Sequence, residues 1–190
     1  MATTESLVKY GTQLLFADHA TDFGAAPVST ANSLIIGTPT DVQMNVSVLN
    51  AGAMWQSAKT ATLARTGSAW PLEWVFGACM ESATPAAGKT FDFYWNASPS
   101  ATAGTANAGG CSGTDLAYTA ASTAQLMFIG SLVCRATGIN VDTNVGRIAI
   151  PHLYGSLVIH NNTAIAMVDA VADNIHFTLT PIIPDGQAAA

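Results

Sequence analysis

The residues in this chain that could carry chemistry are few and widely spaced. Of the four histidines, only His19 has carboxylates beside it, from Asp18 and Asp22 in the segment DHATD. A metal site needs several ligands that converge on a rigid frame, and this segment has the composition of a loop. His160 and His176 each occupy a polar position in an alternating strand pattern, where a histidine is usually at the surface. We therefore expect no metal site and no cofactor.

The sequence also shows no arrangement of residues that is typical of nucleophilic catalysis. A reactive cysteine or serine needs a neighbouring base and a group that orients that base, and the G-x-S-x-G elbow of serine hydrolases does not occur. Cys111, in GGCSG, has no basic neighbour that would lower the pKa of its thiol. Glycosidases use two carboxylates from distant strands, and the only glutamates are Glu5, Glu73 and Glu81. We expect a non-enzymatic protein, with a hydrolase as an alternative that would need carboxylates, or a carboxylate and a histidine, to converge.

Aromatic side chains could instead stack on sugar rings. Aromatic residues form binding platforms when they are exposed and fill cores when they are buried. Trp74 and Trp95 occupy apolar positions of strand patterns, which predicts that they lie in the core. Trp70, just before Pro71 at a turn, is the best candidate for a surface contact.

Charged residues are unusually rare. They make up 9% of the chain, against roughly 25% in ordinary globular domains, while hydrophobic residues make up 49%. A surface with so few charges is weakly hydrated and gives little repulsion between copies. Because exposed apolar surface usually marks a contact, we interpret the composition as that of a protein covered by neighbours in an oligomer or lattice. The alternative is a soluble β protein that merely has few charges.

The composition also argues against nucleic acid and membrane partners. The six lysines and arginines are scattered, so no basic cluster could follow a phosphate backbone or an anionic lipid surface. No apolar run approaches the roughly 18 residues of a membrane-spanning helix, and no secretion signal is visible at the N-terminus. The three cysteines, an odd number, match no metal or redox spacing. We expect no disulfide framework and assembly in a reducing cytoplasm.

From residue 33 onward the sequence has the character of β-strands. Apolar and polar residues alternate at 41–49 and 90–96, and residues 72–80 are apolar on both faces, as in a central strand. Further strands are predicted at 54–65, 124–135, 147–150, 156–161, 165–168 and 174–183. Helical periodicity is nearly absent, and parallel strands would need helices between them. The pattern predicts an all-β fold, an antiparallel β-sandwich with jelly-roll topology.

The chain divides into three predicted parts. Residues 1–31 are weakly patterned and are expected to form an extended N-terminal arm that lies on the body or on a neighbouring subunit. Residues 32–184 form the β-sandwich domain, and residues 185–190 form a flexible tail. Within the sandwich, residues 97–115 contain almost nothing large and predict a long flexible loop. Loops of this length are often functional or form contacts.

Three stretches carry a resemblance to a known class of protein. The runs KTFDFYWNASPSATAGTANAGGCSGTDLAY, QLMFIGSLVCRATG and RIAIPHLYGSLVIHNN have charge-poor strands and loops rich in Ala, Thr, Gly and Asn. In this style the chain, over about residues 40–180, resembles small structural proteins of tailed-bacteriophage virions, of the head decoration or capsid-stabilising type or the tail-associated type. The resemblance includes no diagnostic motif and brings no catalytic, cofactor-binding or metal-binding residues with it.

The resemblance implies a virion protein that is assembled in the host cytoplasm. It implies a homo-oligomer, with a trimer favoured, that binds the major capsid protein or other virion proteins, and neither nucleic acid nor membrane. A capsid decoration protein is the first hypothesis. The alternative is a carbohydrate-binding or receptor-binding module of a phage tail, which predicts exposed aromatic side chains in a groove.

Overall fold

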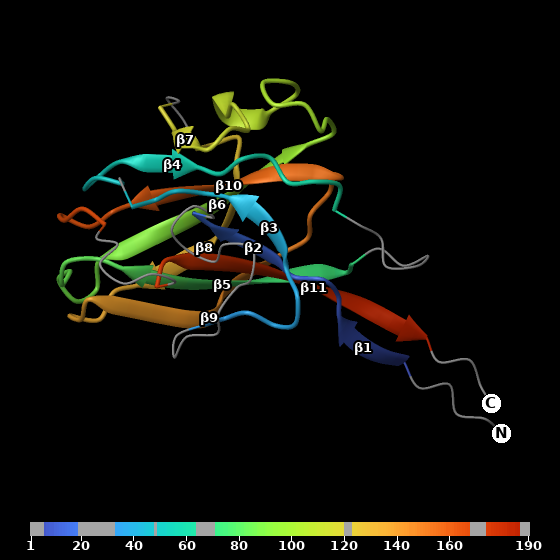
Figure 1. Cartoon of the computed structure of the whole chain (residues 1–190), viewed down its shortest axis with the longest axis horizontal. Coiled ribbons are helices and arrows are strands. Elements are labelled where there is room, and N and C mark those ends of the chain that lie inside the picture. Colours follow the sequence, from blue (N-terminus) through green and yellow to red (C-terminus); the bar gives the residue numbers. More distant parts are fainter. Residues whose placement is uncertain are drawn as a thin grey trace.

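The chain folds into two β-sheets that pack face to face, as the computed structural model in Figure 1 shows. The structure describes residues 6–18, 33–47, 49–63, 71–119, 123–167 and 174–186. Within these ranges the regular elements are strands and one short 3₁₀ turn, η1 (Ala108–Gly110). The predicted all-β class is confirmed, and the two mostly antiparallel sheets have the arrangement of a β-sandwich.

The larger sheet has six strands. Its order is β3-β2-β11-β5-β9, and β1 pairs with the far end of β11. The β2–β3 pair is parallel and the other pairs of this sheet are antiparallel. Its strands are β1 (Ser6–Tyr10), β2 (Leu14–Ala17), β3 (Thr40–Gln43), β5 (Glu73–Glu81), β9 (Ile139–Ile148) and β11 (His176–Gly186).

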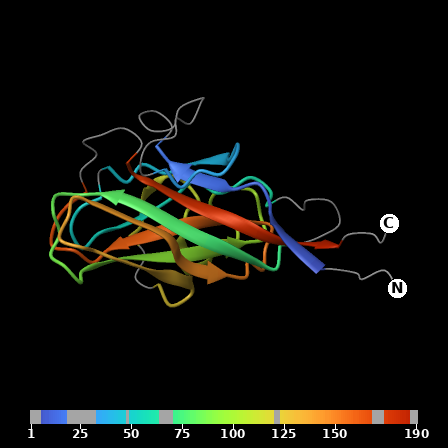
Figure 2. The same cartoon turned by 90° about the horizontal axis from the view of Figure 1, so that it is seen from below.

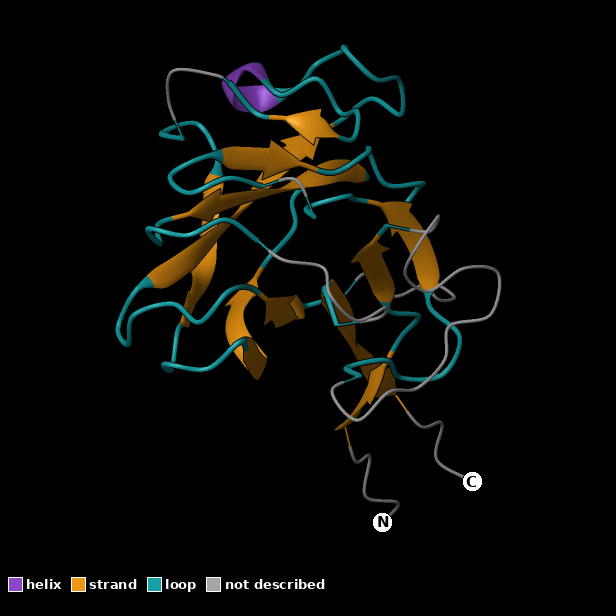
Figure 3. Ribbon diagram, turned by 60° about the vertical axis from the view of Figure 1, so that its left-hand side comes forward, coloured by secondary structure: helices purple, strands orange, loops and turns teal. Residues whose placement is uncertain are grey.

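The smaller sheet has five strands in the order β7-β4-β10-β6-β8, all paired antiparallel. Figure 3 shows this sheet facing the larger one. Its strands are β4 (Met54–Gln56), β6 (Thr90–Ser98), β7 (Leu116–Ala117), β8 (Met127–Val133) and β10 (Tyr154–Asn161).

The hydrophobic core lies between the sheets. Successive side chains of a strand point to opposite faces, so β2, β5, β6, β10 and β11 each contribute every second residue to the core. Phe76 of β5, Phe93 of β6 and Phe177 of β11 meet there, with ring centroids 4.8 Å apart for Phe76–Phe93 and 5.4 Å apart for Phe93–Phe177. Burial of one such ring contributes about 1.5–3 kcal/mol. Trp74 and Trp95 are also buried, as predicted from the sequence.

The alternation at residues 41–49 predicted burial better than it predicted strand length. Val42, Met44 and Val46 are buried, as expected for one face of a strand. Strand β3 ends at Gln43, although the Met44 N–H still donates to the Ala17 carbonyl oxygen of β2 at 2.8 Å. Alternating burial therefore continues beyond the end of the strand, to Val46.

Three further strand boundaries differ from the prediction. Strand β9 begins at Ile139 rather than at residue 147, because its first half has polar residues and gives no apolar run. Of the predicted strand at 165–168, the described residues hold only an isolated bridge at Met167. The strand predicted at 54–65 is shorter in the structure, where among the described residues of this range only Met54–Gln56 form a strand, β4.

The predicted N-terminal arm divides into two parts. Residues Leu14–Ala17 form β2, which is fully buried between β3 and β11, so this stretch belongs to the body rather than to an arm over 1–31. Residues Ser6–Tyr10 form β1, and Figures 1 and 2 show β1 and the end of β11 extending together away from the body. Residues 1–5 and 19–31 lie outside the described residues. At the other end β11 continues to Gly186, so the predicted tail at 185–190 begins within a strand.

The segment at residues 97–115 is anchored to the body, which corrects the prediction of a flexible loop. The Lys59 Nζ atom donates to the Ser98 hydroxyl at 3.1 Å and to the carbonyl oxygens of Thr102 and Thr105 at 2.9 and 3.0 Å. The Gln56 side-chain oxygen accepts hydrogen bonds from two backbone N–H groups near the end of the segment. These hydrogen bonds give partners to backbone groups of the segment that would otherwise have to bind water.

The anchored segment covers part of the outer face of the smaller sheet. Cys111, Tyr118 and Leu126 pack with Val158 of β10 in a second apolar cluster outside the main core. The Tyr118 hydroxyl donates to the Gly109 carbonyl oxygen at 2.5 Å. Part of the apolar sheet surface that we expected neighbouring proteins to cover is thus covered by the chain itself.

Candidate functional site

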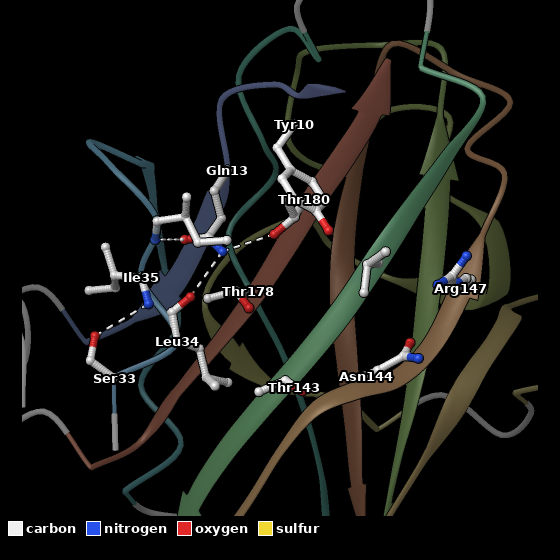
Figure 4. Close-up of a pocket in the computed structure, with 12 residues that line it drawn as sticks. Tyr10, Gln13, Ser33, Leu34, Ile35, Thr143, Asn144, Arg147, Thr178 and Thr180 are labelled. Carbon is white, nitrogen blue, oxygen red and sulfur yellow. Dashed lines mark hydrogen bonds between the residues drawn. The ribbon is translucent and has the colours of Figure 1, made fainter. Parts of the chain in front are cut away.

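A pocket of about 440 Å³ lies on the outer face of the larger sheet. Figure 4 shows its floor on β11, β5 and β9 and one wall formed by the segment Ser33–Ile36. Its lining comes from parts of the chain that are far apart in the sequence, namely Tyr10, Gln13, Ser33, Leu34, Ile35, Ile36, Val75, Thr143, Asn144, Arg147, Thr178 and Thr180.

Buried side chains, rather than a strand ladder, hold this wall in place. The Gln13 Nε2 atom donates to the Leu34 carbonyl oxygen at 3.1 Å and to the Thr180 Oγ1 atom at 2.9 Å. The Gln13 Oε1 atom accepts from the Ile36 N–H at 3.0 Å, and the His176 Nε2 atom accepts from the Leu34 N–H at 3.1 Å. Because these partners satisfy the backbone of the wall, the pocket is pre-formed.

The polar groups of the pocket are mostly neutral. Thr178 and Thr180 supply hydroxyls, Asn144 supplies an amide, and Arg147 supplies the one cation of the lining. The Arg147 guanidinium donates to the Glu73 carboxylate at 2.8 Å, with both side chains partly exposed, and exposed pairs of this kind contribute at most about 1 kcal/mol. Such a lining can hydrogen-bond a peptide or a sugar.

The register of β5 and β11 places Cys79 opposite His176, a pairing that resembles a cysteine–histidine dyad. Both residues are fully buried. Burial, followed by the negative charge of Glu81, raises the pKa of the Cys79 thiol to about 12, and the thiol donates to the Asn174 carbonyl oxygen at 3.1 Å. A nucleophile requires a thiolate, so this protonated thiol does not provide one. The expectation that His176 lies at the surface is wrong.

The other residues proposed from the sequence do not converge on one place. Cys111 is buried, and burial raises the pKa of its thiol to about 12. Asp18 is buried and accepts a hydrogen bond from the Gln43 side chain at 2.9 Å. His19, Asp22, Trp70 and Glu5 lie outside the described residues. Among the residues that the structure describes, no group of three or more His, Cys, Asp or Glu side chains could hold a metal ion.

Asp115 organises a set of hydrogen bonds that the sequence did not reveal. Its carboxylate accepts from the Trp55 Nε1–H at 2.7 Å and from the Asn45 N–H at 2.9 Å. The Gln43 side chain donates to it as well, at 3.3 Å. Asp115 therefore ties the 97–115 segment to the chain after β3 and to β4. Its only sequence signal is that it is a lone carboxylate in an uncharged loop.

Large apolar side chains are exposed beside the pocket. Val8 and Tyr10 of β1 are 65% and 64% exposed, and Ile36 in the pocket wall is 53% exposed. Val8 and Tyr10 share one face of β1, and Tyr10 also lines the pocket. We name this surface, from Val8 through Tyr10 to Ile36, the apolar strip. It runs from the extended ribbon of β1 and β11 into the pocket.

None of the helical structure among the described residues is long and apolar enough to span a membrane. No protein-family model matches the chain, and neither a curated protein nor a solved structure matches it.

Proposed function

We propose that this protein is a non-enzymatic structural component of a phage virion, which decorates or stabilises the outside of a capsid through protein–protein contacts. The observation that carries the proposal is the ribbon of β1 and β11, which extends from the body with Val8 and Tyr10 exposed. Its partners are further copies of the chain, in a homo-oligomer such as a trimer, and the major capsid protein.

The energetics of the surface support a role in assembly. Removing apolar surface from water contributes about 25 cal/mol per Å², and the apolar strip leaves such surface exposed in the free chain. With 9% charged residues, few ionic groups must be desolvated when a neighbour covers this face. In a closed assembly each copy makes several such contacts at once, so modest individual contacts add up to a stable particle.

The proposal includes jelly-roll topology for the body. The strand order β2-β11-β5-β9 in one sheet faces β4-β10-β6-β8 in the other, and the chain crosses from one sheet to the other in most of its connections. This order agrees with the double Greek key of eight-stranded jelly rolls, an architecture found in viral capsid and lectin domains. A rigid body of this kind would hold the ribbon, which is the described remnant of the expected N-terminal arm, in a fixed direction.

Purified virions from the source of this chain provide the test. We expect mass spectrometry to detect the chain in the particles, and cryo-electron microscopy to show ordered copies on the outer surface of the capsid. A double variant, Val8→Asp with Tyr10→Asp, should lose occupancy on the particles. Leu153→Asp, at an exposed apolar residue outside the strip and the pocket, is the matched control and should retain it. Absence of the chain from purified virions would overturn the proposal.

A second candidate function, a carbohydrate-binding or receptor-binding module of a phage tail, is favoured by a different observation. Phe128 of β8 is 56% exposed and lies edge-on to Tyr94 of β6, with ring centroids 5.4 Å apart. Exposed aromatic rings can stack on sugars. Trp95 is buried, as its place in the strand pattern predicted, and does not contribute to such a surface. A glycan-array signal that Phe128→Ala abolishes would favour this function, and a blank array with the native chain would remove it.

A further inference from the structure

The outer edge of β1 offers a row of backbone hydrogen-bonding groups. Among the described strands β1 pairs with β11 alone. The Gly11 N–H donates to the Pro181 carbonyl oxygen at 2.9 Å, which continues the β1–β11 ladder by one residue. In an antiparallel ladder, backbone groups point alternately toward the partner strand and away from it. Since Gly11 points toward β11, Lys9 does so as well, while Val8 and Tyr10 present their N–H and C=O groups to the free edge.

A second contact supports this assignment of the two edges. The Leu72 N–H donates to the Ile182 carbonyl oxygen at 3.0 Å, on the side of β11 that faces β5. Ile182 is the register partner of Tyr10, so at this position the backbone groups of both residues point away from the β1–β11 interface. Pro184, opposite Val8, has no N–H to donate, and at this position the ladder requires none.

Edge strands are often kept from pairing with other chains by proline, a bulge or a charged side chain. Neither proline nor a bulge occurs within Ser6–Tyr10, and Lys9 is the one charged residue there. The register along β11 shifts by one residue between β1 and β2, at Gly11–Gln13. In Figures 1 and 2 β1 then diverges from the body with the end of β11, so that β3 does not cover its edge.

We propose that β1 pairs antiparallel with β1 of a second copy of this chain, about a two-fold axis through Val8. This inference rests on the proposed function, because it names the partner of the ribbon. In this register Val8 lies opposite Val8 of the second copy, and Tyr10 of each copy lies opposite Ser6 of the other. All three residues that point to the free edge, Ser6, Val8 and Tyr10, are then paired, and the three residue pairs exchange about six backbone hydrogen bonds.

The side chains support a second copy as the partner. The pairing aligns the exposed Val8 side chains of the two copies on one face, next to the Tyr10 side chains, so the apolar strips of two copies join. The one charged residue of the strand, Lys9, lies on the opposite face. A two-fold contact is isologous, so it doubles whatever unit forms by other contacts, whether a monomer or a trimer.

Proline at residue 8 tests the pairing without removing a bond from the fold. Val8→Pro deletes an N–H of the free edge, while the ladder bonds to β11 come from Lys9 and Gly11. Edge positions of this kind tolerate proline. We expect light scattering on the full chain to give half the native mass for Val8→Pro, with an unchanged melting temperature. Equal masses for the native chain and Val8→Pro would overturn the pairing.

Cross-linking tests the register independently. The three native cysteines are buried, so an introduced surface thiol would be the reactive one. Val8→Cys places two thiols on residues whose Cα atoms lie about 5.5 Å apart in such a pair, within disulfide range. We expect mild oxidant to give a covalent dimer at least tenfold faster than for Tyr10→Cys. Tyr10 is equally exposed, but its two copies would lie four residues, or about 13 Å, apart along the strands. Equal rates would overturn the register.

The outcomes separate this inference from the proposed function. A native chain that decorates capsids but never pairs through β1 would refute the pairing and leave the structural role intact. A chain that pairs through β1 and is absent from virions would do the reverse. If Val8→Pro lowered occupancy on the capsid without changing the mass in solution, the edge would bind a capsid protein rather than a second copy.

Discussion

Gly130 of β8 and Gly146 of β9 pack so closely against each other's strands that neither position has room for a side chain. A Cβ atom on Gly130 would overlap the Val145 carbonyl oxygen, and a Cβ atom on Gly146 would overlap the Ile129 carbonyl oxygen. The two strands are edges of opposite sheets, and each ladder has an irregular register at this point. The reciprocal pair of glycines therefore lets the sheets meet and closes one side of the sandwich.

Gly146→Ala should destabilise the fold by about 1–3 kcal/mol, the usual cost of overpacking. The obstacle is a backbone carbonyl of β8, which cannot move without disturbing the β6–β8 ladder. Urea unfolding followed by tryptophan fluorescence would measure the change. Gly138→Ala is the control, since its Cβ atom would lie 3.4 Å from the Ser82 carbonyl oxygen, and we expect it to cost little. An unfolding midpoint for Gly146→Ala at the native value would contradict this account of the contact.

Gln13→Leu should loosen the pocket wall. The substitution keeps a buried side chain of similar size but removes the hydrogen bonds to Leu34 and Ile36, and an unpaired buried backbone group costs about 1–3 kcal/mol. Hydrogen exchange at the Ile36 amide should become at least tenfold faster. Ser33→Ala, which removes only a local bond to the Ile35 N–H, should leave the Ile36 amide protected. Unchanged exchange in Gln13→Leu would mean that other contacts hold the wall.

Lys59→Met should release the segment at residues 97–115. Methionine retains the apolar stem but loses the ammonium group that binds Ser98, Thr102 and Thr105. We expect limited proteolysis to cut between residues 99 and 107 several times faster than in the native chain. The control variant Lys89→Met changes an exposed lysine elsewhere in the chain, and the protease should cut it at the native rate. Resistance of Lys59→Met to protease would show that Gln56 and Tyr118 suffice to anchor the segment.

The buried thiols predict a loss of stability in alkali. Burial raises the pKa of Cys79 and of Cys111 to about 12 from an ordinary value of 9.0. Between pH 9 and 12 the unfolded chain loses these protons while the folded chain keeps them, so the free energy of unfolding falls as the pH rises. The limiting slope is about 1.4 kcal/mol per pH unit for each thiol. Urea unfolding at several pH values would measure it.

A double variant isolates this effect. Cys79→Ala with Cys111→Ala should show a shallower decline above pH 9, even though the smaller side chains lower its stability at neutral pH. Ser156→Ala, at a buried residue that does not titrate in this range, should retain the native slope. If the double variant declined as steeply as the native chain, ionisation of other groups would account for the alkaline loss.

The sequence by itself determined which residues face the core. Alternation placed Phe91, Phe93 and Trp95 on one face of β6, and the structure buries all three. The low content of charged residues led us to expect that other proteins cover the surface, and this expectation remains a prediction. Both are local properties: strand alternation has a period of two residues, and composition needs no partner.

Only the tertiary structure decided which residues meet. Gln13 bonds to Thr180 across 167 residues of sequence, and Cys79 faces His176 because of the register of two strands that are far apart in the chain. The split of the predicted arm into a buried β2 and an extended β1 likewise depends on which strand lies beside each. Periodicity fixes the face on which a side chain lies, whereas its neighbour depends on strand order and register, which are set by contacts between distant segments.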